Sequence, residues 1–204
     1  TWTVHAKKDV QVLLQGLEGL PFQDMSILDI GCGIGRIDEL LAEKFGMVYG
    51  IDVSSEMVKL GTQRLKHLPN VHLSNNNGKD LSIFANESFD IVFSYITFQH
   101  CCRKIVYNYI KDVSRVLKEG GIFKFQVYER NWLSSINRCL SKLVHGDFSL
   151  TLDPDDFDTW TSRIYSRNEI VQLLESSGLQ LTAMKRLRRH KYWYTYTLDH
   201  LWVT

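Results

Sequence analysis

The chain has 204 residues, of which 44% are hydrophobic and 23% charged, and its formal net charge at pH 7 is +1. This composition excludes a disordered or collagen-like protein. A net charge so close to zero gives no overall field that would draw the chain to nucleic acid or to a membrane surface. We expect a single domain over 1–204, because a chain of this length buries a substantial core.

Cysteine spacing and hydropathy restrict the class further. The four cysteines stand at positions 32, 101, 102 and 139, and none forms a C-x-x-C pair, so no zinc ribbon is predicted. The carboxylates at 153–158 lack the spacing of a calcium loop, and no metal site is predicted. No apolar run reaches the ~18 residues of a membrane span, and no signal segment is seen. We expect a cytoplasmic protein with reduced thiols.

Helix and strand patterns alternate along the first two thirds of the chain. Apolar residues at helical spacing predict an N-terminal helix over about 4–20. Strands are predicted at 27–30, 47–51, 71–73, 89–95 and 122–128, with helices between them at 36–45, 56–68 and 105–117. This order predicts a parallel sheet with helices on both faces, a three-layer α/β fold that binds ligands beyond the carboxyl ends of its strands.

The alternation is interrupted at about 130–162. This insertion contains Trp132, His145 and Trp160, and we predict a lid that excludes water from a site, although it can equally pack on its own. A helix is expected to begin after Ser166, with Glu169 completing a capping box.

Two strand-like runs follow, at 179–184 and 192–198. Between them, positions 185–191 hold five lysines and arginines in seven residues. They predict a solvent-exposed hairpin, or, as the alternative, a surface for RNA phosphates or an anionic acceptor.

The most informative stretch is the glycine-rich segment at 27–36, which reads ILDIGCGIGR between a predicted strand and a predicted helix. Its glycine spacing is G-x-G-x-G, which matches neither the dinucleotide fingerprint nor the Walker loop. Asp52 follows 21 residues after Gly31, at the end of the next strand. A carboxylate at that place can accept two ribose hydroxyls, so we predict a nucleoside-containing ligand; a turn without ligand is the alternative.

Three ordered motifs carry a family resemblance. They are D-x-G-x-G-x-G at 29–35 followed by Asp52, S-F-D-I-V at 88–92, and R-V-L-K-E-G-G at 115–121. Over about 25–185 the chain resembles the class I S-adenosylmethionine-dependent methyltransferases, closest to their broad small-molecule group. The resemblance implies a Rossmann-like, doubly wound, seven-stranded sheet that is mostly parallel with an antiparallel last strand. It also implies methyl transfer to O or N of a small molecule, with S-adenosylhomocysteine as the product.

The same resemblance implies the cofactor-binding residues. The glycine loop approaches the methionine part, Asp52 binds the ribose and Val53 packs on adenine. Asn77 stands where the family often has an aspartate, so 75–77 can instead form a polar turn. The predicted set is Asp29, Gly31, Cys32, Gly33, Gly35, Asp52, Val53, Asn77, Gly78, Ser94 and Tyr95.

The acceptor side is less defined by sequence. Methyl transfer needs a base only where the nucleophile must lose a proton, and His100 is the predicted base; the alternative is that it caps a helix or orients its loop. The predicted substrate pocket consists of Gln99, Tyr128, Glu129, Trp132 and Trp160. The expected partner is a small-molecule acceptor, with no nucleic acid or membrane, in a monomer or homodimer. Alternatives are a protein or RNA methyltransferase and a non-catalytic S-adenosylmethionine-binding module.

Overall fold

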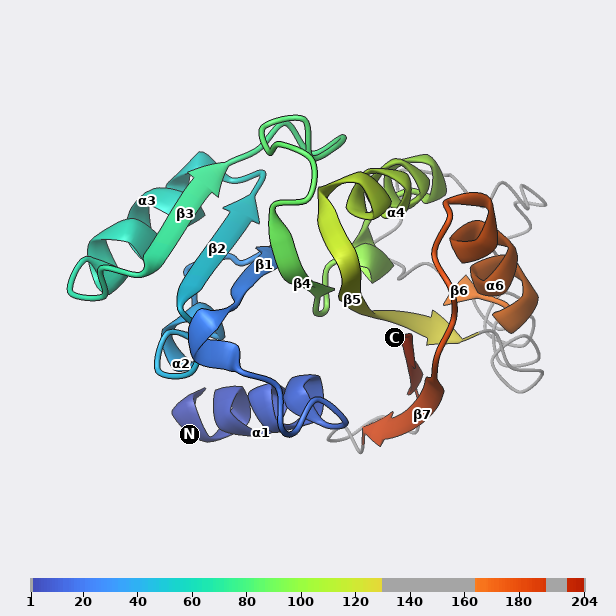
Figure 1. The fold of residues 1–204 in the computed structure, drawn as a ribbon, viewed down its shortest axis with the longest axis horizontal. Coiled ribbons are helices and arrows are strands. Elements are labelled where there is room, and N and C mark those ends of the chain that lie inside the picture. Colours follow the sequence, from blue (N-terminus) through green and yellow to red (C-terminus); the bar gives the residue numbers. More distant parts are fainter. Residues whose placement is uncertain (1, 130–163, 190–197, 204) are drawn as a thin grey trace, which may run out of the picture.

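A twisted sheet runs through the computed structural model, and helices lie against both of its faces (Figure 1). The structure describes residues 2–129, 164–189 and 198–203. The helices are α1 (Trp2–Leu14), α2 (Asp38–Leu41), α3 (Ser55–Leu65), α4 (Arg103–Val116) and α6 (Arg167–Ser176), with 3-10 helices η1 (Phe22–Asp24) and η2 (Phe98–His100). The strands are β1 (Ser26–Ile30), β2 (Met47–Asp52), β3 (Val71–Asn75), β4 (Phe89–Ser94), β5 (Leu117–Glu129), β6 (Ile164–Tyr165), β7 (Met184–Arg189) and β8 (Leu198–Val203).

The strand order places a switch point in the middle of the sheet. The order is β3-β2-β1-β4-β5-β8-β7, and β6 pairs with β5 beside this path. Strands β1 to β5 pair in parallel, which confirms the predicted α/β fold with a parallel sheet. β8 runs antiparallel to both β5 and β7. Because the chain moves outward from β1 through β2 and β3 and then returns to β4, the carboxyl ends of β1 and β4 border a crevice where ligands bind in such folds.

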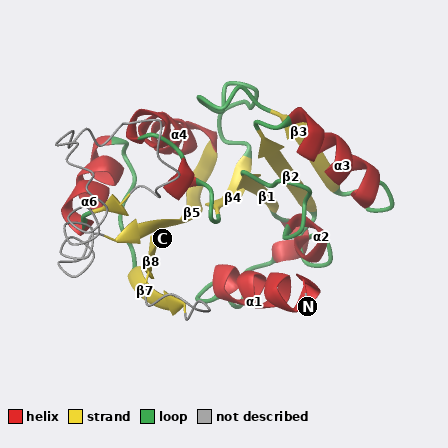
Figure 2. Cartoon of the chain, turned by 180° about the vertical axis from the view of Figure 1, so that it is seen from behind, coloured by secondary structure: helices red, strands yellow, loops and turns green. Residues whose placement is uncertain are grey.

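Two apolar clusters hold the layers together, one on each face of the sheet. Residues of α4 and α6 pack on one face, and residues of α1 and α2 pack on the other. Both views place α3 beside β2 and β3, and α4 beside α6 (Figure 2). The buried strands read as nearly continuous apolar runs because both faces are covered, which is why β1 and β4 are recognisable from sequence alone.

A buried lysine attaches the end of α1 to the sheet. Lys124 of β5 is only 4% exposed, and its Nζ donates hydrogen bonds to the carbonyls of Leu13 at 2.6 Å and Gln15 at 2.9 Å. These carbonyls belong to the end of the helix, where no further turn satisfies them. The ammonium group therefore serves as the terminal donor for α1.

Several predicted boundaries are wrong. The sheet has eight strands in the described residues, not seven, because β6 adds a two-residue pairing to β5. The N-terminal helix ends at Leu14 rather than at 20, since Gly16 and Gly19 adopt left-handed backbone with φ of 80° and 96°. The helix expected over 36–45 is reduced to α2, with turns on both sides.

The C-terminal strands also differ from expectation. The strand expected at 179–184 begins only at Met184 and continues through the basic run as β7, which pairs antiparallel with β8. An edge strand carries charges readily, so the polarity of the basic run led to the strand being placed too early. Most of the run at 192–198 and the insertion at 130–162 lie outside the described residues. The capping box of Ser166 and Glu169 is present at the start of α6, as predicted.

The described part of the chain contains neither a membrane-spanning helix nor a cluster of metal ligands. None of its helices has both the length and the apolar character of a membrane span. No group of three histidine, cysteine or acidic side chains gathers there in a way that suits a metal ion. Cys32, Cys101 and Cys102 are free thiols.

Candidate functional site

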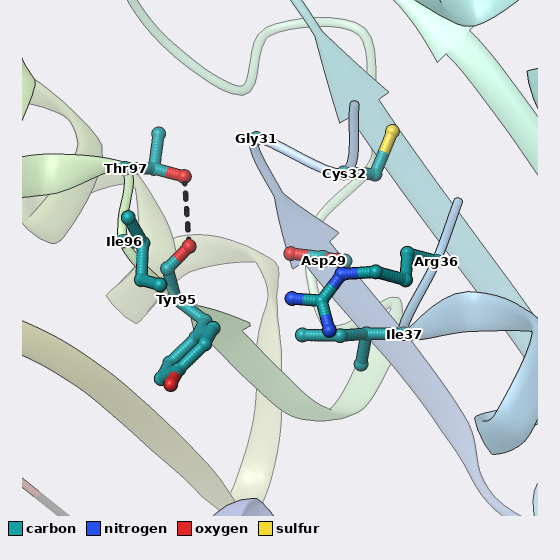
Figure 3. A pocket seen from close by; sticks show the side chains of 8 residues that line it. All are labelled: Asp29, Gly31, Cys32, Arg36, Ile37, Tyr95, Ile96 and Thr97. Atoms are coloured by element: carbon teal, nitrogen blue, oxygen red, sulfur yellow. Dashed lines mark hydrogen bonds between the residues drawn. The ribbon is translucent and has the colours of Figure 1, made fainter. Parts of the chain in front are cut away.

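A cavity of about 250 Å³ lies between the loop that follows β1 and the loop that follows β4. Figure 3 shows the β1 side of the cavity, with Asp29 and Arg36, facing the β4 side, with Tyr95 and Thr97. The lining residues are Asp29, Gly31, Cys32, Arg36, Ile37, Tyr95, Ile96 and Thr97. The predicted glycine loop and the loop after the fourth strand thus meet at one site, which is the switch point of the sheet.

The glycine loop is shaped by close approaches that only glycine allows. Gly31 has a φ of 89°, and a Cβ there would lie 2.2 Å from Thr97 Oγ1. Its amide donates to the carbonyl of Ile51 at 2.8 Å, which ties the loop to the end of β2. Gly33 and Gly35 also have positive φ, of 56° and 72°. A side chain at Gly31 would push the two loops apart and alter the cavity.

Asp52 at the end of β2 fixes this loop with both of its oxygens. Oδ2 accepts a hydrogen bond from the amide of Gly33 at 2.9 Å, and Oδ1 accepts one from the amide of Ser54 at 2.9 Å. Each carboxylate oxygen can accept a second hydrogen bond. The carboxylate is therefore held in place by backbone while it keeps capacity for two further donors, such as a pair of neighbouring hydroxyls.

An exposed apolar surface formed by Val53 and Gly78, the shelf, lies next to the Asp52 carboxylate. Val53 is 64% exposed, and a Cβ on Gly78 would come within 2.8 Å of Val53 Cγ1. Gly78 itself has a φ of 71°. An exposed branched side chain beside a bare stretch of backbone offers a surface on which a flat aromatic ring can lie.

The loop that carries Gly78 is held by two residues that the sequence did not single out. Asn76 is 8% exposed, and its Oδ1 accepts hydrogen bonds from the Gly78 amide and from the hydroxyl of Tyr109. Tyr109 comes from α4, so only the tertiary fold brings it here. The signal in the sequence was the polar triplet at 75–77, in which the middle residue is the buried one.

The side chain of Asn77 forms its hydrogen bonds with residues of its own turn. Its Oδ1 accepts from the amides of Lys79 and Asp80, and its Nδ2 donates to Asp80 Oδ1 at 2.9 Å. This geometry corresponds to the polar-turn alternative rather than to a side chain directed at a ligand.

Tyr95 and Ser94 connect the end of β4 to its neighbours. The buried hydroxyl of Ser94 donates to the carbonyl of Ile30 at 3.0 Å. The hydroxyl of Tyr95 donates to Asp9 Oδ1 at 2.7 Å, and Asp9 Oδ2 accepts from Arg36 Nη1 at 2.9 Å. Asp9 of α1 therefore bridges two residues that line the cavity. Neither Asp9 nor Arg36 was among the predicted site residues.

Two of the predicted acceptor-side residues, His100 and Gln99, have described side chains, and neither lines the cavity. His100, at the end of η2, is exposed and does not line it; its Nε2 lies 3.1 Å from Gln99 Nε2. Partial burial lowers the pKa of His100 below its usual value. Gln99 is buried at 3% exposure. Tyr128 and Glu129 end β5, but their side chains, like all of Trp132 and Trp160, fall outside what is described.

One buried acid, Asp29, lines the cavity, and a second, Asp38, is buried without lining it. Burial, followed by the charge of Asp38, raises the pKa of Asp29 well above its usual range, and Asp29 is 3% exposed. Asp38 is fully buried, and burial raises its pKa to about 7. Burial likewise raises the pKa of the Cys32 thiol, so this cysteine stays protonated and serves as wall rather than nucleophile. Asp38 was not predicted as a site residue.

Comparison with known proteins shows what this arrangement is similar to. A family model described as a methyltransferase domain matches residues 27–121. Demethylmenaquinone methyltransferase of Tropheryma whipplei (strain Twist) is 29% identical over 171 residues, which cover 79% of this chain and 69% of that protein. Ubiquinone biosynthesis O-methyltransferase of Coxiella burnetii (strain Dugway 5J108-111) is 26% identical over 167 residues, 80% of this chain and 67% of that protein.

A solved methyltransferase structure is similar to this chain in fold. The crystal structure of a SAM-dependent methyltransferase from Methanosarcina mazei superimposes with a TM-score of 0.69 at 26% identity. The superposition covers 89% of this chain and 92% of that one.

Proposed function

The chain belongs to the class I S-adenosylmethionine-dependent methyltransferases, and we propose that it transfers the cofactor's methyl group to an oxygen or nitrogen atom of a small-molecule acceptor. The observation that carries the proposal is the Asp52 carboxylate, bonded to the amides of Gly33 and Ser54 and placed next to the shelf of Val53 and Gly78. The two features suit the ribose and the adenine of one nucleoside.

The residues present fit the cofactor along its length. Asp52 has acceptor capacity for two ribose hydroxyls, and a Cβ at Gly78 would fill the space beside Val53. The cavity at the other end of the glycine loop is lined by the Asp29 carboxyl group and the Arg36 guanidinium group. These two groups suit the ammonium and the carboxylate of an amino-acid end.

Bound S-adenosylmethionine supplies a methyl group on a positively charged sulfur, which is already an activated leaving group. What this chain contributes is alignment and exclusion of water. Tyr95, Ile96 and Thr97 wall the cavity opposite the glycine loop and restrict the direction from which an acceptor reaches it. Holding two reactants in line supplies about 7–11 kcal/mol of the barrier in favourable cases.

His100 is the proposed base for acceptors that lose a proton. It lies one turn beyond the cavity wall, and its lowered pKa keeps the ring neutral at pH 7, so that it can accept a proton. The insertion that begins after β5 is the proposed cover of the acceptor.

Ubiquinone precursors with a ring hydroxyl are the first acceptors to test, because one relative is named a ubiquinone biosynthesis O-methyltransferase. The small-molecule partner, the cytoplasmic location and the monomeric or homodimeric state remain predictions from the sequence.

Calorimetric titration with S-adenosylmethionine and with S-adenosylhomocysteine tests the cofactor site. We expect both to bind, and Asp52→Ala to weaken each by at least about tenfold, since it removes a charged hydrogen-bond acceptor worth roughly 1.5–3 kcal/mol. Asp24→Ala is the matched control, because Asp24 is exposed in η1 at the opposite end of β1. Equal affinity in wild type and Asp52→Ala would show that the ribose site is elsewhere.

A further inference from the structure

Asp38 is a charged residue type buried without an ordinary partner. It is 0% exposed, and neither of its carboxylate oxygens has a hydrogen-bond partner of ordinary geometry within the described residues; its own backbone amide favours the ionised form but is outweighed by burial. Leaving an ionised carboxylate in such a place is costly, and the group holds a proton instead. The titratable group that bears on Asp38 most directly is another buried acid, Asp29, which is 3% exposed, and after burial the charge of Asp38 in turn raises the pKa of Asp29. Two neighbouring buried carboxyl groups do not both ionise readily, because like charges in a site of low dielectric repel each other.

Asp29 connects this pair to the cavity. It lines the cavity, whereas Asp38 does not and acts there only through Asp29. The other groups that bear on the pair are Asp52, which disfavours ionisation of Asp29, Arg36, which favours it, and Arg64, which favours ionisation of Asp38. The neighbouring Cys32 thiol is neutral, since its own pKa is raised. Burial is the largest influence on both acids, so the two arginine charges do not remove the proton.

We propose that Asp29 and Asp38 share one proton while the cavity is free of ligand, and that they release it to solvent when the cofactor's ammonium group binds beside Asp29. The inference rests on the proposed function, because it places the methionine end of the cofactor in this cavity. Asp38 is then a positioning residue: it sets the charge that Asp29 presents to the ligand.

The sign of the resulting pH dependence follows from the linkage. A cation next to the pair favours the ionised form, so its pKa is lower in the complex than in the free protein. Binding therefore releases protons, and affinity increases as the pH rises. Below the pKa of the pair in the complex the affinity no longer depends on this proton; between the two pKa values it changes by up to about tenfold per pH unit.

The experiment measures how many protons the protein releases when the ligand binds. Wild type and Asp38→Asn are titrated with S-adenosylhomocysteine at pH 7 in phosphate and in Tris, whose ionisation enthalpies differ, so the change in observed enthalpy gives the protons released. Asp38→Asn removes the charge that, after burial, raises the pKa of Asp29 and supplies an amide that can donate to the Asp29 carboxylate, so Asp29 holds a proton less often before the ligand arrives. We expect wild type to release up to one proton more than this variant. Taking the difference between the two proteins cancels any proton that the ligand's own amine takes up.

Two controls locate the effect. Asp90→Asn removes another partly buried carboxylate, at the start of β4 and outside the cavity lining, which already has donors in Ser26 and Lys118, so the proton count stays at the wild-type value. The second control is 5′-methylthioadenosine, which has the nucleoside but no amino-acid end. Its binding should release no proton from either protein.

The outcomes separate this inference from the proposed function. If neither S-adenosylmethionine nor S-adenosylhomocysteine binds wild type, the proposed function fails. If S-adenosylhomocysteine binds with equal proton counts in wild type and Asp38→Asn, the cofactor site stands and the shared proton is refuted. Should Asp38→Asn not fold, difference infrared spectroscopy of wild type gives the answer: the carbonyl band of a protonated carboxyl group disappears on binding if the inference is right and persists if it is wrong.

Discussion

The hydroxyl of Tyr95 donates a 2.7 Å hydrogen bond to Asp9 Oδ1, across 86 residues of sequence. This bond, together with the one from Arg36 to the same carboxylate, fastens the middle of α1 to both walls of the cavity. The position of the first helix is thus coupled to the shape of the ligand site.

Tyr95→Phe is expected to weaken the attachment of α1 to the cavity wall while the aromatic ring stays in place, because only the hydroxyl that bonds Asp9 is lost. A hydrogen bond to a charged group contributes about 1.5–3 kcal/mol, and Asp9 keeps Arg36 as a partner, so the loss of stability should lie near the lower value. Hydrogen exchange of the α1 amides should become faster. Tyr107→Phe is the control, since Tyr107 is 44% exposed on α4; equal exchange in the two variants would contradict the coupling.

Gly78→Ala is expected to weaken the binding of S-adenosylhomocysteine and of 5′-methylthioadenosine equally, by about tenfold. The added Cβ meets Val53 Cγ1 at 2.8 Å and fills the shelf for the adenine. Gly120→Ala imposes a similar backbone strain, with a φ of 72° against 71°, but its Cβ has nothing within 4 Å. Affinity measured for both variants separates strain from steric loss, and equal effects would refute the shelf.

If His100 is the base, the acid side of the kcat profile reports its titration. Burial lowers its pKa, so the rate should fall only below the ordinary value of 6.5, where the ring becomes protonated and can no longer accept a proton. His100→Gln should slow transfer about 10²–10⁴-fold and abolish that limb. His67→Gln, on an exposed position, should keep it. An unchanged rate in His100→Gln at every pH removes His100 from the mechanism.

Neutralising the basic run on β7 discriminates between acceptor classes. The variant replaces Lys185, Arg186, Arg188 and Arg189 by glutamine. A small-molecule enzyme should keep its kcat/KM within about twofold, because β7 is the last strand of the sheet, two strands away from β5. A large loss, with a strong dependence on salt in wild type, would instead favour an RNA acceptor.

The parts of the site that depend on local pattern were predictable from sequence. Glycine spacing and the acid at the end of the second strand placed Gly31 and Asp52 at one crevice, since parallel strands end on the same edge. The bounds of helices and strands were harder to predict from the sequence. α2 is short because positive-φ glycines precede it, and the basic run extends a strand because β8 pairs with it.

Residues that act through distant partners could not be found this way. Asp38 has the sequence pattern of an ordinary acid near the start of a helix, and only the fold shows that it is fully buried and that its charge adds to burial in raising the pKa of Asp29. Asn76 and Asn77 are neighbours of the same type, yet the first is buried under Tyr109 and the second is exposed. Only packing between elements distinguishes the two.

The two hydrogen bonds of Lys124 set a limit on how the N-terminus can be shortened. Its ammonium group lies in the sheet, while the acceptors at Leu13 and Gln15 lie in the segment that a trimmed protein would lose first. Removing residues 1–15 would therefore take both of these acceptors from the buried ammonium group as well as delete a helix. A truncated protein that also carries Lys124→Met should recover part of the lost stability, so the helix and the lysine have to be redesigned together.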